Sequence, residues 1–489
     1  MVNDMANKIK NFLGSKIVKG NTGEETFLSW KETIGYGMGK GAQGMTTSIM
    51  NSSPANYFIT NIFGIPTGRA ASIRLFCGLW DAINDPILGF LLDRTRSKEG
   101  DKMRPYIKWA PFLSALFTLM FFVGQPGWSP AFKLVFMVIA FVGWDAAYTC
   151  VDVPIGALAL SITPNAIERI KLFGIANIMR TVMGIATGGI ITVALTMQSV
   201  KENPTPVYVA AAIVAFIGMI AFTRPTYYWT KERATYSEEV PSFKEQMSLL
   251  FQNKPLFMLV IANVLFLFTT LPAAVQMYFT IDLMGNADYN LILGFAGGPA
   301  IFLSAIIVPK IAEKFGSKMD FRKFYLACCL GGAAVHTLMH ITMKNTLMSN
   351  AGAVGWGPAI IVMIFIGLAA LPTEFKNICA KQMEAETVDY IERKTGQRAE
   401  GVMLSMIAFT GKLQNSASSA VVLFFLALAK YQEHADALPY PQTSGAYNML
   451  IAMNTLIPAV AWLLMVVPIW FFNTRSVKQK RVTEEGIAQ

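Results

Sequence analysis

The chain has 489 residues, of which 53% are hydrophobic and 15% are charged, and its mean hydropathy is +0.43. Soluble domains carry about 25% charged residues. A chain with so few charges cannot cover a water-facing surface with polar groups, which argues against a soluble enzyme and favours lipid as its solvent.

Twelve stretches of the sequence are long enough to cross a bilayer as helices, since a span takes about 20 mainly apolar residues. Eight of the twelve carry no Asp, Glu, Lys or Arg, and four carry one or a few embedded charges. The runs are continuous rather than alternating, which indicates helices and not strands. In chain order they are 34–58, 70–92, 109–132, 132–155, 181–200, 203–223, 255–281, 289–309, 324–343, 345–373, 401–429 and 437–474.

Basic residues in the connections predict the orientation, because cytoplasmic loops are enriched in Lys and Arg. If the N-terminus is cytoplasmic, the tails and even-numbered connections hold 32 of the 41 basic residues, and the opposite connections hold five. We therefore expect a multi-pass inner-membrane protein with both termini in the cytoplasm. The net charge of +10 then belongs to these loops, and no nucleic-acid partner is expected.

The spans divide six and six around a polar connection. We predict a cytoplasmic tail at 1–32, a six-helix bundle at 33–223, a cytoplasmic linker at 224–255, a second bundle at 256–473 and a cytoplasmic tail at 474–489. Loops 93–98 and 313–318 both place an acid before several bases. This similarity fits an internal repeat of the kind found in secondary transporters, although two unrelated basic loops would look the same.

Acids inside the second predicted span are the sharpest functional signal, because ionisable groups in lipid are costly and mark ion or substrate paths. Asp81 and Asp85 lie one turn apart on one helix face, with Asn84 beside them. Carboxylate and amide oxygens suit a small hard cation, and two adjacent acids also favour protonation of one. Sodium and the proton therefore both remain open, as does a structural acid pair neutralised by Arg74 or Lys412.

The fourth span adds Tyr148, Thr149 and Asp152, with Asp145 one turn before Thr149. An aromatic face can stack on a sugar ring, and a carboxylate can accept hydrogen bonds from its hydroxyls. Asp152 is thus a candidate for the cation, the solute or both, and Asp145 is a candidate either for the same site or for a contact with a neighbouring helix. Bases that can balance these acids lie in other spans, at Lys40, Arg180 and Lys412.

Several other chemistries have no support in the sequence. It has no phosphate-binding Gly-x-x-x-x-Gly-Lys-Ser/Thr loop, no His-Glu-x-x-His zinc motif and no Gly-x-Ser-x-Gly elbow. His336 and His340 lie one turn apart, but two histidines alone do not make a metal site. We expect no cofactor and no metal beyond a sodium ion at Asp81 and Asp85.

The segment from Trp80 to Pro86, with Asp93–Ser97 and Arg104-Pro-Tyr106 after it, resembles the glycoside-pentoside-hexuronide:cation symporters, of which melibiose permease is the reference member. Further matches follow in order from the first span to the last; they are Tyr36-Gly37, 57–63, Tyr148-Thr149, Asp152-Val-Pro154 and 386–390. The resemblance implies the major facilitator superfamily fold, an all-α membrane protein with twelve transmembrane helices in two six-helix bundles. It also implies transport of a sugar together with a monovalent cation.

The resemblance also implies roles position by position. The cation-site positions match Asp81, Asp85, Asn84, Thr149 and Asp152, and the sugar-pocket positions match Lys40, Tyr148, Asp152 and Arg180. Lys412 matches the lysine that links the eleventh helix to the acids. Independently, we expect the charged loop from Asp93 to Arg104, which carries Arg94 and Arg96, to be a cytoplasmic latch between conformations.

Three positions depart from the melibiose-type pattern. Gly41 stands where an acid holds galactosyl hydroxyls, Gly156 replaces a ring-stacking tryptophan, and Gly78 replaces a base. The cation motif is kept while the galactoside clamp is lost. A more positive pocket would favour a hexuronide or glucuronide, but a neutral pentoside fits equally well. The competing functions are transport of a lipid or drug by the same fold, and a membrane enzyme or receptor.

Overall fold

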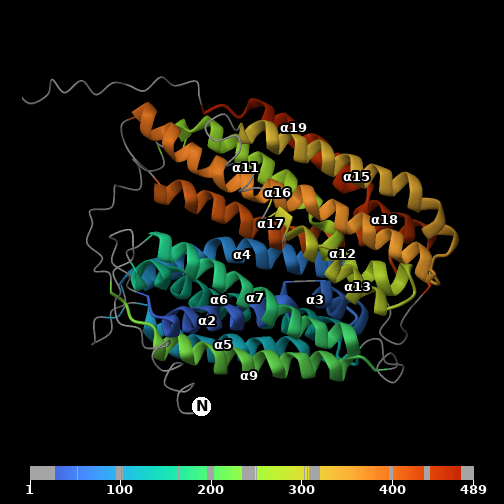
Figure 1. Cartoon of the computed structure of the whole chain (residues 1–489). Coiled ribbons are helices and arrows are strands. Elements are labelled where there is room, and N and C mark those ends of the chain that lie inside the picture. Colours follow the sequence, from blue (N-terminus) through green and yellow to red (C-terminus); the bar gives the residue numbers. More distant parts are fainter. Residues whose placement is uncertain are drawn as a thin grey trace, which may run out of the picture. The chain divides into compact units, whose positions relative to one another are not determined.

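The computed structural model describes residues 28–51, 53–94, 101, 103–163, 166–194, 203–233, 248, 251–301, 303, 304, 307, 320–395, 400–433 and 441–474. All regular elements within these ranges are helical (Figure 1). The chain divides into two compact units. Unit 1 comprises residues 1–238 and 432–440, and unit 2 comprises residues 239–431 and 441–489.

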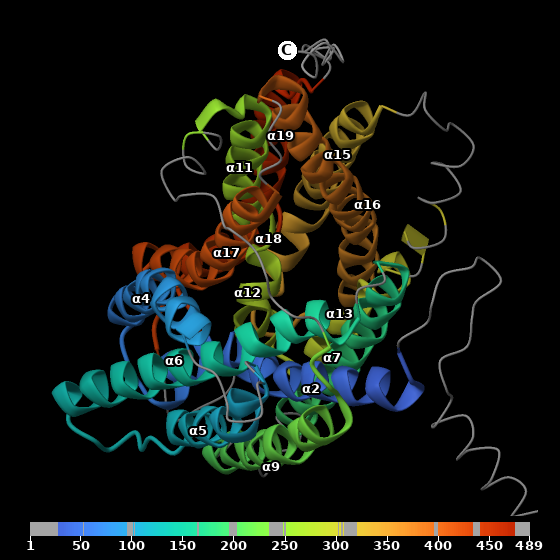
Figure 2. The same cartoon turned by 90° about the vertical axis from the view of Figure 1, so that its left-hand side faces the viewer.

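Unit 1 is a bundle in which α2 packs along both α7 and α9, and α5 packs between α6 and α9 (Figure 2). Its elements are α2 (Trp30–Met50), α3 (Ser53–Tyr57), the π-helical turn η1 (Phe58–Ile62), α4 (Thr67–Arg94), α5 (Arg104–Phe122), α6 (Pro130–Ile162), α7 (Ala166–Ala194) and α9 (Thr205–Trp229).

Unit 2 is a second bundle, in which α15 packs on α16 and α19, and α11 packs on α19. Its elements are α11 (Lys254–Phe266), the 3₁₀ turn η2 (Leu267–Thr269), α12 (Leu271–Tyr278), the π-helical turn η3 (Phe279–Leu283), α13 (Asp288–Ala296), α15 (Phe321–Ser349), α16 (Trp356–Thr395), α17 (Glu400–Leu428), α18 (Ser444–Asn454) and α19 (Leu456–Phe471).

Within the described ranges, eight helices or helix runs are long and apolar enough to cross a membrane. The prediction of an all-helical membrane protein is confirmed, and the total of twelve spans stays a prediction. Several boundaries differ from expectation. α9 continues to Trp229, into the predicted linker, and α16 continues to Thr395, well beyond the expected end at residue 373. α7 begins at Ala166, well before the expected start at residue 181, and α5 ends at Phe122 rather than at residue 132.

Side-chain caps explain where several helices begin. Ser29 and Glu32 form a reciprocal capping box at the start of α2, and Asp320 accepts from two backbone N–H groups at the start of α15. Ser129 and Thr443 cap α6 and α18 in the same way. Each cap satisfies backbone donors that have no partner inside the helix.

Glycines on α2 set its distance from the neighbouring helices. A Cβ atom at Gly44 would overlap the backbone carbonyl of Arg180 on α7, and one at Gly39 would overlap Thr226 on α9. Gly184 on α7 faces the backbone of Gly44 in turn. Small residues therefore let these backbones approach closely, which is the packing role that membrane helices commonly give to glycine.

The same turn occurs once in each unit. It supports the predicted repeat, whereas loops 93–98 and 313–318, from which the repeat was predicted, lie largely outside the described residues. Residues 57–64 read Tyr-Phe-Ile-Thr-Asn-Ile-Phe-Gly, and residues 278–285 read Tyr-Phe-Thr-Ile-Asp-Leu-Met-Gly. Both segments form a π-helical turn and end at a glycine with φ near +74°, namely +73° at Gly64 and +75° at Gly285. The same sequence pattern with the same backbone geometry supports an internal repeat.

The close contact between α2 and α7 predicts a position-specific packing effect. Gly44→Ala places a methyl group against backbone that cannot rotate away, and overpacking of this kind costs about 1–3 kcal/mol. We expect a lower midpoint of thermal unfolding in detergent. Gly189→Ala, on the partner helix α7, adds a methyl group that meets no atom within 4 Å and is the control. Equal melting of the two variants would contradict the packing role.

Candidate functional site

An ion pair between Lys40 and Asp152 lies in unit 1. The Lys40 Nζ atom is 3.1 Å from Asp152 Oδ1, and the two side chains are 16% and 29% exposed. Lys40 comes from α2 and Asp152 from α6, so the pair joins the first helix of the bundle to the fourth. Both residues were predicted to contact the solute, and the structure brings them together.

A second polar cluster joins α4 to α6. The buried Asn84 amide nitrogen lies 3.4 Å from Asp145 Oδ2 and 3.3 Å from Thr149 Oγ1. Asn84 and Thr149 were both predicted to help bind the cation. Asp145 was expected either to join them or to contact a neighbouring helix, and the structure shows it at the α4 contact. The amide therefore fixes α4 against the face of α6 that carries Asp145 and Thr149.

Tyr148 lies between these clusters along α6. Its ring stacks on Trp144 with centroids 5.1 Å apart and planes 20° apart. The charges of Asp152, Arg180 and Asp81 lie close enough to act on its hydroxyl. Tyr148 thus marks a region of unit 1 where acids from α4 and α6 meet a base from α7.

The remaining predicted residues are placed less completely. Asp81 is partly buried on α4, and Arg180 is exposed on α7. Asp85 lies on α4, Arg94 at its end and Lys412 on α17 of unit 2, but their side chains lie outside the described residues. Arg96 also lies outside them. Contacts of these four side chains stay predictions.

Two other predicted features have local explanations. Arg74 donates to the carbonyl of Met50 at 3.1 Å and lies over the Phe141 ring. His336 contacts the Gly332 carbonyl and His340 the Thr455 hydroxyl, each through Nδ1 at 2.8 Å. The described residues contain no cluster of three or more His, Cys, Asp or Glu side chains suited to a metal.

Lys376 is a buried charge that sequence reasoning missed. It follows the predicted span that ends at residue 373, but α16 continues past it, and the residue is 3% exposed. Its ammonium lies 3.2 Å from the centroid of the Phe266 ring, close to the turn η2. The signal in the sequence was the spacing from Gly355-Trp-Gly-Pro-Ala, which repeats Gly127-Trp-Ser-Pro-Ala and aligns Lys376 with Tyr148.

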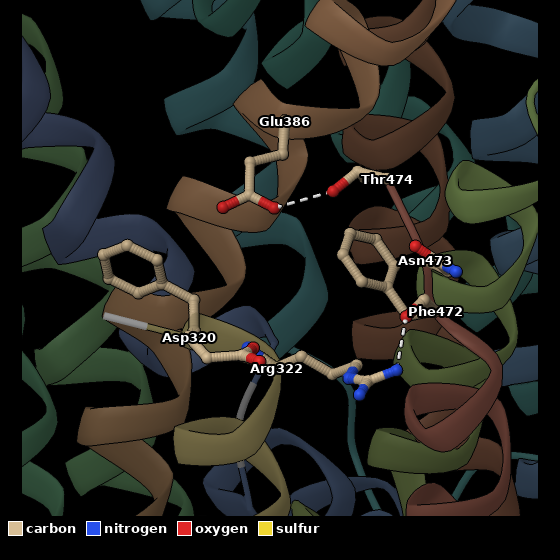
Figure 3. Close-up of a pocket in the computed structure, with 7 residues that line it drawn as sticks. Asp320, Arg322, Glu386, Phe472, Asn473 and Thr474 are labelled. Carbon is tan, nitrogen blue, oxygen red and sulfur yellow. Dashed lines mark hydrogen bonds between the residues drawn. The ribbon is translucent and has the colours of Figure 1, made fainter. Parts of the chain in front are cut away.

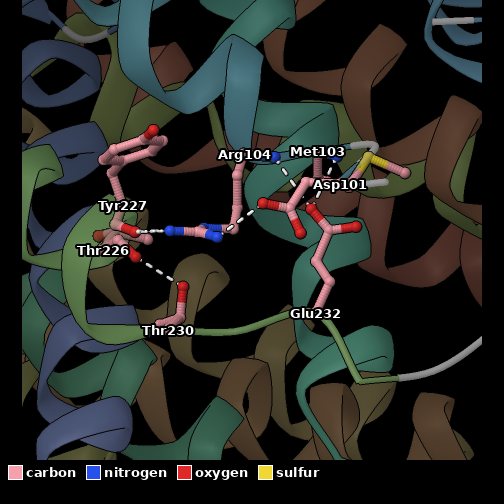
Figure 4. Close-up of polar contacts among 7 residues, drawn as sticks. All are labelled: Asp101, Met103, Arg104, Thr226, Tyr227, Thr230 and Glu232. Carbon is pink, nitrogen blue, oxygen red and sulfur yellow. Dashed lines mark hydrogen bonds and ion pairs between the residues drawn. The ribbon is translucent and has the colours of Figure 1, made fainter. Parts of the chain in front are cut away.

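In each unit, a base at the start of one helix contacts the carboxyl end of another. These are α5 and α9 in unit 1, and α15 and α19 in unit 2. In unit 1, Arg104 donates to the Tyr227 carbonyl at 3.0 Å and pairs with Asp101 at 2.6 Å, while Glu232 accepts from the backbone of Arg104 (Figure 4). The described part of the predicted latch loop therefore contacts its own unit.

The matching contact in unit 2 is made by Arg322, which donates to the Phe472 carbonyl at 3.3 Å beside a small polar pocket (Figure 3). Glu386 lines the same pocket and accepts from the Thr474 hydroxyl at 3.1 Å. Bases near helix C-termini satisfy carbonyls that have no partner within the helix. The repeat therefore includes the contact between a base and the carbonyl groups at the end of the last helix of each unit.

Two of the three glycine departures, Gly41 and Gly156, differ in their surroundings. A Cβ at Gly41 would overlap the Met183 sulfur, so this methionine fills the space. A Cβ at Gly156 meets no atom within 4 Å. The sequence has neither the acid at position 41 nor the stacking ring at position 156, and only position 156 has open space beside it.

The family model described as "MFS/sugar transport protein" matches residues 35–475. The chain belongs to that family. It is therefore a multi-pass membrane transporter and not an enzyme.

Similar proteins include the "Glucuronide carrier protein homolog" of Escherichia coli strain K12, at 23% identity over 94% of this chain and 95% of that protein. The "Isoprimeverose transporter" of Lactiplantibacillus pentosus is 25% identical over 94% of this chain and 92% of that protein. A solved D-xylose–proton symporter has the same fold, with a TM-score of 0.61 at 14% identity over 92% of this chain and 98% of that one.

The Lys40–Asp152 pair predicts non-additive effects on stability. Removing one partner leaves the other charge in a mostly buried position, whereas removing both avoids this penalty. We expect Lys40→Met/Asp152→Asn to melt higher than the sum of the single effects predicts, with a coupling of about 1 kcal/mol. Additive melting shifts in a double-mutant cycle would show that the pair contributes no interaction energy.

Proposed function

We propose that this transporter carries a sugar or sugar acid together with a sodium ion or a proton, by alternating access between two bundles. The observation that carries the proposal is the Lys40–Asp152 ion pair at 3.1 Å, next to the Asn84 cluster. Intramembrane charges of this kind usually mark substrate and ion paths. No other cofactor is proposed.

The cation is proposed to bind at Asp81 and Asp85, assisted by Asn84, Thr149 and Asp152. Asn84 places α4 against Thr149 within 3.3 Å, which brings oxygen atoms from two helices to one region. Hard oxygen ligands suit sodium. The same acids also suit a proton, so the coupling ion is proposed at the level of a monovalent cation.

Coupling follows from the charge of this site. Two carboxylates in a low-dielectric environment are costly without compensation, and a bound cation offsets that cost and organises Asp152 and Lys412. The solute then binds better, and by linkage it improves cation binding by the same factor. Each charge that crosses contributes about 2.3 kcal/mol per 100 mV of membrane potential.

The solute is proposed to contact Lys40, Tyr148, Asp152 and Arg180. Lys40 and Arg180 favour an acidic sugar such as a hexuronide, and a similar protein is named a glucuronide carrier homolog. Another similar protein is named an isoprimeverose transporter, which supports a neutral glycoside. The stacked Tyr148 and Trp144 rings are compatible with both.

The same fold also supports a second candidate, a non-sugar solute such as a lipid or drug. The polar character of the Lys40–Asp152 region argues against it. The charge distribution of the loops supports a place in the inner membrane with both termini cytoplasmic, in a lipid bilayer and without a nucleic-acid partner.

Uptake into vesicles tests the proposed function. Labelled glucuronides, pentosides and neutral glycosides are offered with and without a sodium gradient, at two external pH values. We expect accumulation of at least one sugar that depends on one of the gradients. Accumulation of none of them, combined with transport of a lipid or drug, would overturn the sugar assignment.

Replacing one acid should separate driving force from translocation. In Asp85→Cys, we expect cation-driven accumulation to disappear while solute exchange continues, because the solute contacts lie mainly on other helices. Asp288→Asn, in the first turn of α13 of unit 2, is the matched control and should accumulate solute normally. Full concentrative uptake by Asp85→Cys would remove the acid pair from the mechanism.

The predicted latch can be tested through Arg94 and Arg96. Their charges are proposed to pair in one conformation and separate in the other, so neutralising both should change the transport rate more than the solute affinity. Rates come from uptake, and affinities come from equilibrium binding to the purified protein. Reduced affinity with an unchanged rate would contradict a latch.

A further inference from the structure

Tyr36 on α2 buries a hydroxyl group that has no hydrogen bond. The residue is 0% exposed. Within the part of the chain that the structure describes, no group donates to this hydroxyl or accepts from it. Burying a hydroxyl without a hydrogen bond is costly, so this group has no stabilising role in the conformation that the structure shows.

The ring of Tyr36 packs in an apolar cluster of unit 1 that a phenylalanine would fill equally well. The cluster includes Val151 and Ile155 on α6, together with aliphatic side chains from α5 and α7. A Cβ atom at Gly39 would lie 3.3 Å from Ile155, so α2 and α6 approach closely at this depth. The hydroxyl group is therefore the part of the side chain that packing does not use.

The ion pair between Lys40 and Asp152 lies beside this hydroxyl. Asp152 follows Val151 on α6, and its charge lies close enough to act on the Tyr36 hydroxyl. Lys40 lies one turn after Tyr36 on the same face of α2, with its Nζ atom 3.1 Å from Asp152 Oδ1. An ammonium that holds the acid and a hydroxyl with an unused donor are thus neighbours on one helix.

Two other polar side chains near Asp152 are less suited to replace the ammonium. Tyr148 is half-buried, so a solute or water can satisfy its hydroxyl, and Arg180 is exposed on α7. The charge of Arg180 acts on Tyr148. The Tyr36 hydroxyl differs from both, because it is fully buried and has no competing hydrogen bond among the described residues.

An acidic solute would compete with Asp152 for the Lys40 ammonium. While Lys40 is bound to Asp152, the two charges cancel and attract no anion. When the ammonium turns to the carboxylate of a solute, Asp152 loses this partner in a mostly buried position. A buried carboxylate that loses its cation is costly, and a hydrogen bond to a charged acceptor is among the stronger hydrogen bonds. A hydroxyl donor already in place offsets part of that cost.

We propose that the Tyr36 hydroxyl donates to Asp152 when Lys40 turns to the carboxylate of an acidic sugar, which makes Tyr36 a positioning residue for this class of solute. The inference rests on the proposed function and narrows its solute to a hexuronide or glucuronide. In the structure, Lys40 holds the acid and the hydroxyl is unused. In the solute complex, Lys40 holds the solute and Tyr36 holds the acid.

Thermal unfolding in detergent, without solute, tests the hydrogen bond itself. Tyr36→Phe alone removes an unpaired hydroxyl, so the midpoint should stay unchanged or rise. In a Lys40→Met background the hydroxyl donates to Asp152, and we expect Tyr36→Phe to lower the midpoint by about 3 °C. Tyr325→Phe, which removes another buried hydroxyl without a partner among the described residues, should have the same effect in both backgrounds.

An equal effect of Tyr36→Phe in the two backgrounds would overturn the proposal, because another donor such as Arg180 would then have replaced Lys40. If Lys40→Met does not fold, the decision falls to a binding comparison that needs only the single variant Tyr36→Phe.

Equilibrium binding to the purified protein tests the class of solute. The two probes are p-nitrophenyl glucuronide and p-nitrophenyl glucoside, which differ only in a carboxylate in place of a hydroxymethyl group. We expect Tyr36→Phe to weaken binding of the glucuronide about tenfold. Binding of the glucoside should stay unchanged, because a neutral solute does not draw Lys40 away from Asp152. Equal weakening of both probes would show that Tyr36 has only a packing role and would overturn the proposal.

The outcomes separate this inference from the proposed function. Uptake of a neutral sugar by the native sequence, without binding of the glucuronide, would overturn the acidic solute and leave sugar transport standing. Transport of a lipid or drug and of no sugar would instead overturn the proposed function. Selective loss of glucuronide binding in Tyr36→Phe supports both.

Discussion

The structure depends on one constraint, which is that polar groups inside lipid must find partners within the protein. Backbone groups meet this constraint by forming helices. Side chains meet it through contacts between helices, such as Lys40 with Asp152 and Asn84 with Asp145. The same polar contacts that make the bundle stable therefore also place the groups that are proposed to handle the solute.

The repeat separates what is architectural from what is functional. The π-helical turns, the glycines that follow them and the bases that contact the sixth helix occur in both units. The acids do not, because Asp81 and Asp85 match Phe302 and Ile306 when the chain is shifted by the same interval as the turns. The proposed cation chemistry thus belongs to one half of a duplicated framework.

Much of the fold was predictable because lipid imposes a simple rule on composition. Long apolar runs indicated helices, and intramembrane acids indicated a site. The pairing of Lys40 with Asp152 was not predictable from spacing, since it joins residues 112 positions apart. Lys376 was missed for a different reason. The apolar run ends at residue 373, whereas the helix continues to Thr395 and the Lys376 ammonium lies over the aromatic face of Phe266.

The two glycines in the proposed pocket bear on how this transporter could acquire a new solute. Met183 already occupies the space beside Gly41, so an acid there must displace the flexible end of this side chain on α7. The space beside Gly156 is open, and an aromatic side chain there faces no such requirement. A ring-stacking clamp can therefore arise without rearrangement of a neighbour, whereas a carboxylate clamp also needs Met183 to adopt another rotamer, and selection would reach the first more readily.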